Sequence, residues 1–171
     1  MNAVLDRWNS LERDVAAEVV LPCCGSQVWA AELAARRPIS DETRLLVESS
    51  DVWRGLPVQA WQEAFDSHPR IGEQKPQGHA TDESLKSSAT EQAVALSADE
   101  AAKLALKEAN RRYEVRFGRI FIICASGKSA SEILAALETR MQNDDATELH
   151  EAAEQQRQIT ALRLKRWLEV D

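Results

Sequence analysis

Histidine, cysteine and basic charge are all scarce in this sequence of 171 residues. It contains three histidines, three cysteines, and 21 Lys+Arg against 28 Asp+Glu, which gives a formal net charge of -7. A protein that binds a phosphate backbone needs a basic surface, so this charge argues against nucleic acid as a partner. It equally argues against an anionic membrane surface. A small anionic substrate stays possible, because a local arginine can bind it inside an acidic protein.

Long apolar runs and address signals are also missing. No run approaches the roughly 20 apolar residues that span a bilayer. The opening residues, MNAVLDRWNSLERD, carry acids and lack the apolar core of a signal peptide, and the closing EVD is not a peroxisomal address. Three cysteines, of which Cys23 and Cys24 are adjacent, do not make a disulfide framework. We therefore expect a reducing, cytoplasmic setting.

The sequence motifs of cofactor and metal chemistry are absent as well. Adjacent cysteines lack the spacing of a zinc site, and the sequence contains no GxGxxG, Walker loop, HExxH or GxSxG. We expect neither a metal site nor an organic cofactor.

The sequence does contain a succession of helical patterns. Its length and even composition predict one domain over residues 1–171, and we expect an all-α bundle of about seven to nine helices. The last helix is predicted from about Asp145 to Trp167. Other predicted starts are Ser10 (with a stop at Pro22), Ser26, Ser40, Pro57, and the S-x-x-E capping boxes at Ser97 and Ser129.

Two stretches do not fit a helix. Residues 120–125, IFIICA, are apolar and β-branched but too short for a helix, which predicts one buried extended segment. The buried backbone N–H and C=O groups of such a segment need partners, which a polar ligand could supply. Residues 71–88 show no apolar periodicity before Leu85 and are predicted to form a loop, which could close as a lid over a ligand.

Three places combine polar side chains in ways that suggest chemistry. DSHPRIGE, residues 66–73, fixes His68 beside Pro69 at a helix end, where it is either a proton donor or a cation that favours the helix dipole. Ser88 and Glu91 are candidates too, although they also fit a capping box. Arg163 lies beside the buried stripe of the last helix, although it could instead be a solvated cation near the end of that helix. His79 and His150 are expected on the surface.

Several ordered motifs together resemble one protein family. They are HPRIGE, the S-x-x-E-Q of residues 88–92, RFG-x-x-FI-x-CA at residues 116–125, GKSASEIL…RMQND, and EQQRQITALRL. This combination is similar to the 2-oxo-4-hydroxy-4-carboxy-5-ureidoimidazoline (OHCU) decarboxylases of uric acid degradation, over nearly the whole chain. The resemblance implies an all-helical, cofactor-free, typically dimeric enzyme that converts OHCU to (S)-allantoin and carbon dioxide.

The resemblance also assigns residues. It implies catalytic roles for His68, Glu91 and Arg163. It also implies that the chain binds the small molecule OHCU and forms a homodimer. Two alternatives stay open on residue chemistry alone: a hydrolase of a related ureide, and a non-catalytic helical interaction module. The implied substrate contacts are Pro69, Ser88, Gln92, Phe121, Ile122, Ile123, Cys124 and Ala125.

Overall fold

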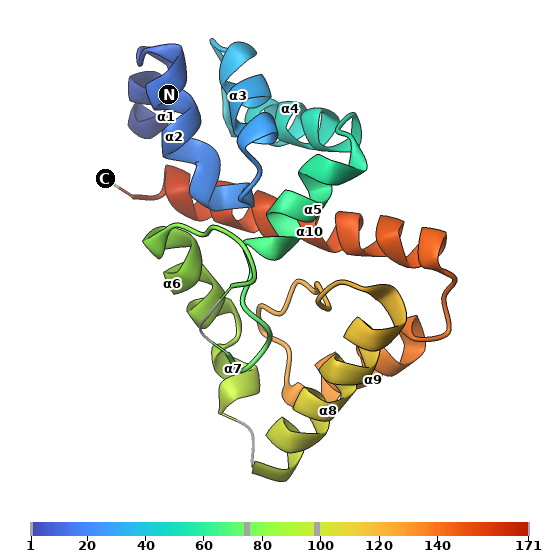
Figure 1. The fold of residues 1–171 in the computed structure, drawn as a ribbon. Helices are drawn as coiled ribbons and strands as arrows, with labels where there is room; N and C mark the ends of the chain where they lie inside the picture. Colours follow the sequence, from blue (N-terminus) through green and yellow to red (C-terminus); the bar gives the residue numbers. More distant parts are fainter. Residues whose placement is uncertain (1, 74–75, 98–99, 171) are drawn as a thin grey trace. The chain divides into compact units, whose positions relative to one another are not determined.

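The computed structural model describes residues 2–73, 76–97 and 100–170. Within these ranges the chain forms ten α-helices and no strand, with one isolated bridge between Pro69 and Pro76, which confirms the all-α prediction. None of these helices is long and apolar enough to cross a membrane. In chain order the helices are α1 (Ala3–Asn9), α2 (Arg13–Cys24), α3 (Gln27–Ala35), α4 (Glu42–Arg54), α5 (Val58–Asp66), α6 (Asp82–Glu91), α7 (Ala93–Leu96), α8 (Glu100–Phe117), α9 (Ala130–Arg140) and α10 (Asp145–Leu168) (Figure 1).

The residue contacts divide the chain into two compact units. Unit 1 comprises Met1–Ala64 and Arg157–Asp171, and unit 2 comprises Phe65–Gln156. The division falls within α5 and α10, so each of these helices contributes residues to both units. A single domain over the whole chain stays a prediction.

Unit 1 contains buried tryptophans whose indole N–H groups donate to backbone carbonyls. Trp8 donates to the Ala16 carbonyl at 2.8 Å, and Trp29 donates from α3 to the Ser49 carbonyl of α4 at 3.2 Å. A buried indole usually needs a partner for its polar atom. These bonds therefore fix the mutual packing of the N-terminal helices while the rings fill the core.

The predicted helix starts in unit 1 are partly correct. Ser26 caps α3 as predicted, with its hydroxyl accepting from the Trp29 amide at 3.3 Å. Ser10 is wrong as a start because it is the C-cap of a short helix, α1, that the pattern missed. Pro22 does not stop α2 but lies inside its last turn, and Gly25 at φ 89° ends that helix. The cap of α4 is Asp41, one residue after the predicted Ser40.

Unit 2 contains α6 to α9, and α8 packs beside α9 (Figure 1). The capping box at Ser129 is present in both directions, since the Ser129 hydroxyl accepts from the Glu132 amide and the Glu132 carboxylate accepts from the Ser129 amide. Gly118, at φ +67°, ends α8 in the left-handed region that favours glycine. The capping box predicted at Ser97 involves residues 98–99, which lie outside the described ranges.

The helix α6 corrects two predictions. It begins at Asp82 with Thr81 as its N-cap, so the predicted loop 71–88 ends earlier. Ser88 and Glu91 lie inside this helix, so they do not form a capping box at its start. The apolar periodicity missed α6 because its buried face is polar, with Ser84, Ser88 and Glu91 as its buried residues.

The predicted extended segment is present between α8 and α9. Residues 120–125 are all buried and belong to no helix. The hydrophobic core cluster of unit 2 includes Phe121, Ile123 and Ala125, whereas Ile122 and Cys124 lie outside that cluster of described residues. Alternate side chains therefore face the core, which is the two-residue period of extended backbone.

Candidate active site

His68 lies on a buried turn that directly follows α5. Its side chain is buried, as is Pro69, and the His68 amide donates to the Phe65 carbonyl at 3.1 Å. The amide of Gly78 donates to the Asp66 carbonyl at 2.6 Å, so the loop folds back against the end of α5. A Cβ on Gly78 would lie 3.0 Å from the Asp66 Cβ, so this close approach favours glycine.

The imidazole of His68 is held by a glutamine far away in the sequence. Nε2 of His68 lies 2.7 Å from Oε1 of Gln156, which is on α10 and is fully buried. An amide oxygen is an acceptor, so the hydrogen bond places a proton on Nε2 of the imidazole. This contact orients the ring and belongs to a buried histidine rather than to a solvated turn residue.

The rest of the HPRIGE turn is tied to two helices of unit 2. Arg70 forms a two-pronged ion pair with Glu114 of α8, in which Nη2 and Oε2 are 3.0 Å apart. The hydrogen bonds to Glu114 raise the pKa of the Arg70 guanidinium above its ordinary value. The amide of Gly72 donates to Oε1 of Gln92, at the end of α6, at 3.1 Å. These bonds fix the turn that follows the candidate proton donor.

The candidate residues of α6 share one buried helix face. Ser88 and Glu91 are three residues apart, which places them on the same side of the helix, and both are buried. Gln92 follows as the C-cap and is also buried. A buried carboxylate and amide are costly unless they meet polar groups. This face is therefore suited to bind a polar ligand or polar protein groups.

The extended segment receives protein hydrogen bonds along one edge. Arg140 of α9 donates to the Ile122 carbonyl at 2.7 Å, and Gln155 of α10 accepts from the Cys124 amide at 2.9 Å. Lys128 donates to the Cys124 carbonyl at 2.8 Å. Part of the backbone that was expected to pair with a ligand is therefore bonded to protein side chains instead.

The opposite edge of the extended segment carries the backbone groups of Phe121 and Ile123. Across the ranges that the structure describes, no hydrogen bond uses the backbone N–H or C=O group of Phe121 or Ile123. Both residues are buried, with exposed fractions of 4% and 8%. Buried backbone groups are nearly always paired in a working protein. These groups therefore remain suitable partners for a bound ligand.

Arg163 belongs to unit 1, in the second half of α10. Its side chain is only 3% exposed, so the alternative of a solvated cation is wrong. Nη1 donates to the Pro22 carbonyl at 3.1 Å, in the last turn of α2. A cation at that end of a helix is favoured by the helix dipole. Arg163 therefore has a structural contact that the sequence did not reveal.

The thiol of Cys24 lies near the same arginine but is chemically inert. Burial raises the pKa of Cys24 to about 12, although hydrogen bonds from Ser26 and Thr160 and the charge of Arg163 oppose that shift. A thiol with this pKa is neutral at physiological pH and is a poor nucleophile. Within the described ranges, no three His, Cys, Asp or Glu side chains are grouped as metal ligands.

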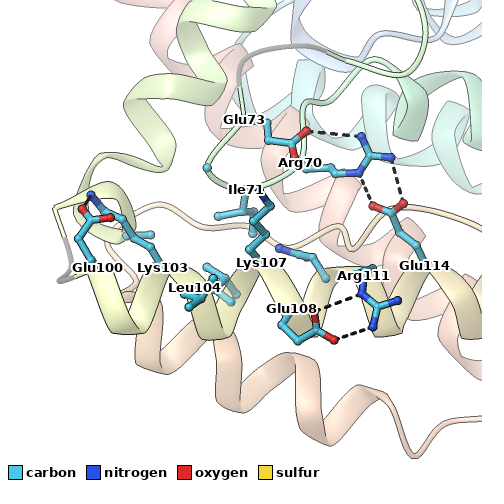
Figure 2. A pocket seen from close by; sticks show the side chains of 14 residues that line it. Arg70, Ile71, Glu73, Glu100, Lys103, Leu104, Lys107, Glu108, Arg111 and Glu114 are labelled. Carbon is cyan, nitrogen blue, oxygen red and sulfur yellow. Dashed lines mark hydrogen bonds and ion pairs between the residues drawn. The ribbon is translucent and has the colours of Figure 1, made fainter.

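A pocket of about 680 Å³ lies beside the HPRIGE turn in unit 2 (Figure 2). Arg70, Ile71, Gly72 and Glu73 contribute to its lining, together with the exposed side of α8. Its charges are largely paired, since Arg70 reaches Glu114, and two further ion pairs lie along α8. None of the predicted site residues lines this pocket.

Several residues that support the candidate site were not predicted from the sequence. Gln156 contacts His68, while Arg140 and Gln155 contact the extended segment. All three stand within motifs that carried the family resemblance, RMQND and EQQRQ. Those motifs were the available signal, but the distances along the chain concealed which groups each residue would meet.

The comparisons with known proteins agree with these motifs. The family model of OHCU decarboxylase matches residues 9–165. The uric acid degradation bifunctional protein TTL of Arabidopsis thaliana is 37% identical over 144 residues, which cover 83% of this chain and 44% of that protein. The chain therefore spans less than half of that relative. The 2-oxo-4-hydroxy-4-carboxy-5-ureidoimidazoline decarboxylase of Amia calva is 30% identical over 145 residues, covering 84% of this chain and 79% of that protein.

Solved structures agree as well. A crystal structure of OHCU decarboxylase in the presence of (S)-allantoin matches with a TM-score of 0.76 and 33% identity, covering 88% of this chain and 96% of the other. The crystal structure of (S)-allantoin synthase has a TM-score of 0.71 and 17% identity, covers 95% of this chain and 53% of the other, and supports the fold alone. The chain therefore belongs to the OHCU decarboxylase family of carboxy-lyases.

Proposed function

We propose that this chain converts OHCU to (S)-allantoin and carbon dioxide, with His68, Glu91 and Arg163 as its catalytic groups. The observation that carries the proposal is the buried imidazole of His68, oriented by Gln156 on the HPRIGE turn of a chain from this family. A histidine that is buried and fixed in this way is placed for proton transfer, since its unperturbed pKa of about 6.5 is near physiological pH.

The substrate supplies its own electron sink. In OHCU the ring carbon that bears the hydroxyl and the carboxylate is bonded to a C=N carbon that bears the ureido group. As the bond to the carboxylate breaks, its electron pair moves into the C=N system and carbon dioxide leaves. The ring nitrogen takes up a proton, which leaves an enol. A second proton then reaches one face of the ureido carbon while the enol hydroxyl loses its proton and becomes the ring carbonyl, and this sets the S configuration. A cofactor that stores electrons is therefore not required, and we propose cofactor-independent chemistry.

Each catalytic residue has a role suited to its chemistry. His68 binds the hydroxyl and carboxylate region of the substrate and donates a proton during the cycle. Arg163 provides a planar guanidinium for a carboxylate or a ring carbonyl. Glu91 accepts hydrogen bonds from ureido or ring N–H groups and so fixes the ring. All three side chains are buried, and low exposure strengthens such electrostatic interactions.

The remaining predicted residues are proposed to bind the substrate. Phe121 and Ile123 have backbone groups with no hydrogen bond among the described residues, and these suit the amide-like edges of the OHCU ring. Ser88 and Gln92 add a hydroxyl and an amide from the end of α6. The predicted contacts also include Pro69, Ile122, Cys124 and Ala125.

Two finer properties are also proposed. The family resemblance suggests a homodimer, and the three cysteines, which make no disulfide framework, suggest a reducing, cytoplasmic location. The acidic charge of the chain gives no reason to add nucleic acid or membrane as a partner. The molar mass in solution, measured by light scattering after gel filtration, tests the dimer against the 19.1 kDa of one chain.

The experiment that tests the reaction is to mix the protein with OHCU freshly generated from urate. OHCU decays spontaneously to racemic allantoin, so the chirality of the product identifies the catalyst. Rapid formation of (S)-allantoin supports the decarboxylase. Racemic allantoin at the background rate would support a binding module, and a ring-opened product would support a ureide hydrolase.

A further inference from the structure

The extended segment between α8 and α9 has one edge paired with protein and one edge available. Its bonds to Arg140, Gln155 and Lys128 all involve the backbone of Ile122 or Cys124. In extended backbone, the N–H and C=O groups of alternate residues point to the same edge. The neighbouring residue Ile123 therefore presents its own N–H and C=O groups at the opposite edge.

Peptide planarity makes this arrangement specific to Ile123. In a trans peptide the C=O of one residue and the N–H of the next point in opposite directions. Arg140 holds the Ile122 carbonyl, which fixes the direction of the Ile123 N–H. Gln155 holds the Cys124 amide, which fixes the direction of the Ile123 carbonyl. Both peptide planes that adjoin Ile123 are thus oriented by side chains.

The two side chains are themselves held in place. The guanidinium of Arg140 donates from Nε to Oε1 of Glu148 at 2.9 Å, and its carbon lies 4.4 Å from the centroid of the Phe121 ring. The side-chain amide of Gln155 donates to Oε1 of Glu151 at 3.0 Å, which leaves its own Oε1 to accept from the Cys124 amide. These contacts join protein side chains, so they can hold Arg140 and Gln155 in fixed positions. The segment that these two residues bind can then keep a single conformation.

We propose that Arg140 and Gln155 are positioning residues that aim the backbone N–H and C=O groups of Ile123 at the substrate. A donor and an acceptor on one residue are complementary to a ring edge that carries an adjacent carbonyl and N–H. This inference rests on the proposed function and assigns such an edge of OHCU to Ile123. The two residues act through the backbone rather than by touching the reacting atoms.

Gln155 offers the sharper test because an Arg140 variant would also break a buried ion pair. Gln155→Met keeps the side-chain length but removes the acceptor for the Cys124 amide. The double variant E151Q/Q155E exchanges the two side chains, so a carboxylate oxygen accepts from Cys124 and the charge stays constant. Gln142→Met is the matched control, since Gln142 is exposed.

Steady-state kinetics with OHCU and amide hydrogen exchange by NMR are measured on all four proteins. We expect Gln155→Met to raise KM about tenfold with little change in kcat, because a contact made equally in the ground and transition states affects binding. Exchange at the Cys124 amide should accelerate at least tenfold. The exchanged pair E151Q/Q155E and the Gln142 control should both remain within about twofold of the wild type.

The outcomes separate this inference from the proposed function. A wild type that forms no excess of (S)-allantoin would overturn the proposed function and this inference with it. An active wild type whose KM is unchanged in Gln155→Met would overturn the inference alone. Equal losses of activity in Gln155→Met and E151Q/Q155E would also overturn it, because restoring the acceptor would then have no effect.

Discussion

Nε2 of His68 lies 2.7 Å from Oε1 of Gln156, although 88 residues separate them in the chain. Gln156 has no exposed surface, so its amide is fixed by the surrounding protein. Because its oxygen accepts from Nε2, the second ring nitrogen, Nδ1, is the one that this hydrogen bond does not occupy. Neutral His68 is therefore expected to carry its ring proton on Nε2.

Gln156→Met tests this orientation. Methionine has similar length but offers no comparable acceptor, so the imidazole loses its fixed direction and kcat/KM should fall about tenfold or more. Imidazole ¹⁵N NMR of the wild type should show neutral His68 protonated on Nε2. The other two histidines, His79 and His150, are exposed and can be replaced to simplify the spectrum. A neutral His68 protonated on Nδ1 would contradict the assignment.

Arg163→Lys separates substrate binding from helix packing. Lysine keeps the charge but loses the planar fork, and the substrate carboxylate is already charged in the ground state, so KM should rise more than kcat falls. Because Arg163 also binds the Pro22 carbonyl, the melting temperature is measured on the same samples. Arg54→Lys, on an exposed side chain, is the control. Equal kinetics for the two variants would remove Arg163 from the site.

The buried ion pair between Arg140 and Glu148 should contribute strongly to the stability of the protein. Glu148 has no exposed surface and accepts from Arg140, Tyr113 and Asn143. Breaking a buried pair by removing one partner costs about 3–5 kcal/mol. We expect Glu148→Gln to lower the free energy of unfolding by an amount of that order in urea titrations.

Glu138→Gln is the matched control for that measurement. Glu138 pairs with Arg112 on the surface, where both side chains are nearly half exposed. Exposed pairs contribute about 1 kcal/mol or less. If the two variants lose the same free energy of unfolding, the buried network does not hold the segment.

Removal of metal ions should leave the activity intact. The electrons released with carbon dioxide are accepted by the C=N group of the substrate, so the proposed mechanism needs no Lewis acid. We expect the same kcat/KM before and after dialysis against EDTA. A loss that added zinc restores would overturn the cofactor-free mechanism.

Helices could be predicted from the sequence where a local residue pattern marks them, and were missed where that pattern is lacking. Local patterns succeeded at Ser129, where the capping box is complete within four residues. They failed at α6, because its buried face carries Ser84, Ser88 and Glu91 and so lacks the apolar period on which helix prediction depends. A polar face of this kind is costly to bury and is expected where function requires it.

The site was harder to predict than the fold. His68 was found from a local motif, but its partner Gln156 depends on how α10 returns past the turn after α5, which no local pattern specifies. Arg163 was expected beside a buried stripe and is buried. The sequence did not predict the bond from Arg163 to the Pro22 carbonyl. A helix stop was predicted at Pro22, whereas this proline lies inside the last turn of α2.

The most direct test of the proposed function is the circular dichroism of allantoin formed from fresh OHCU, recorded over time with wild type and His68→Asn. Asparagine remains polar but does not titrate, and general acid–base catalysis contributes about 10²–10⁴-fold. We predict a rapid signal of (S)-allantoin with the wild type and an initial rate lower by that factor in the variant, with an unchanged melting temperature. Racemic product from the wild type, or a His68→Asn rate within about twofold of it, would contradict the proposed mechanism.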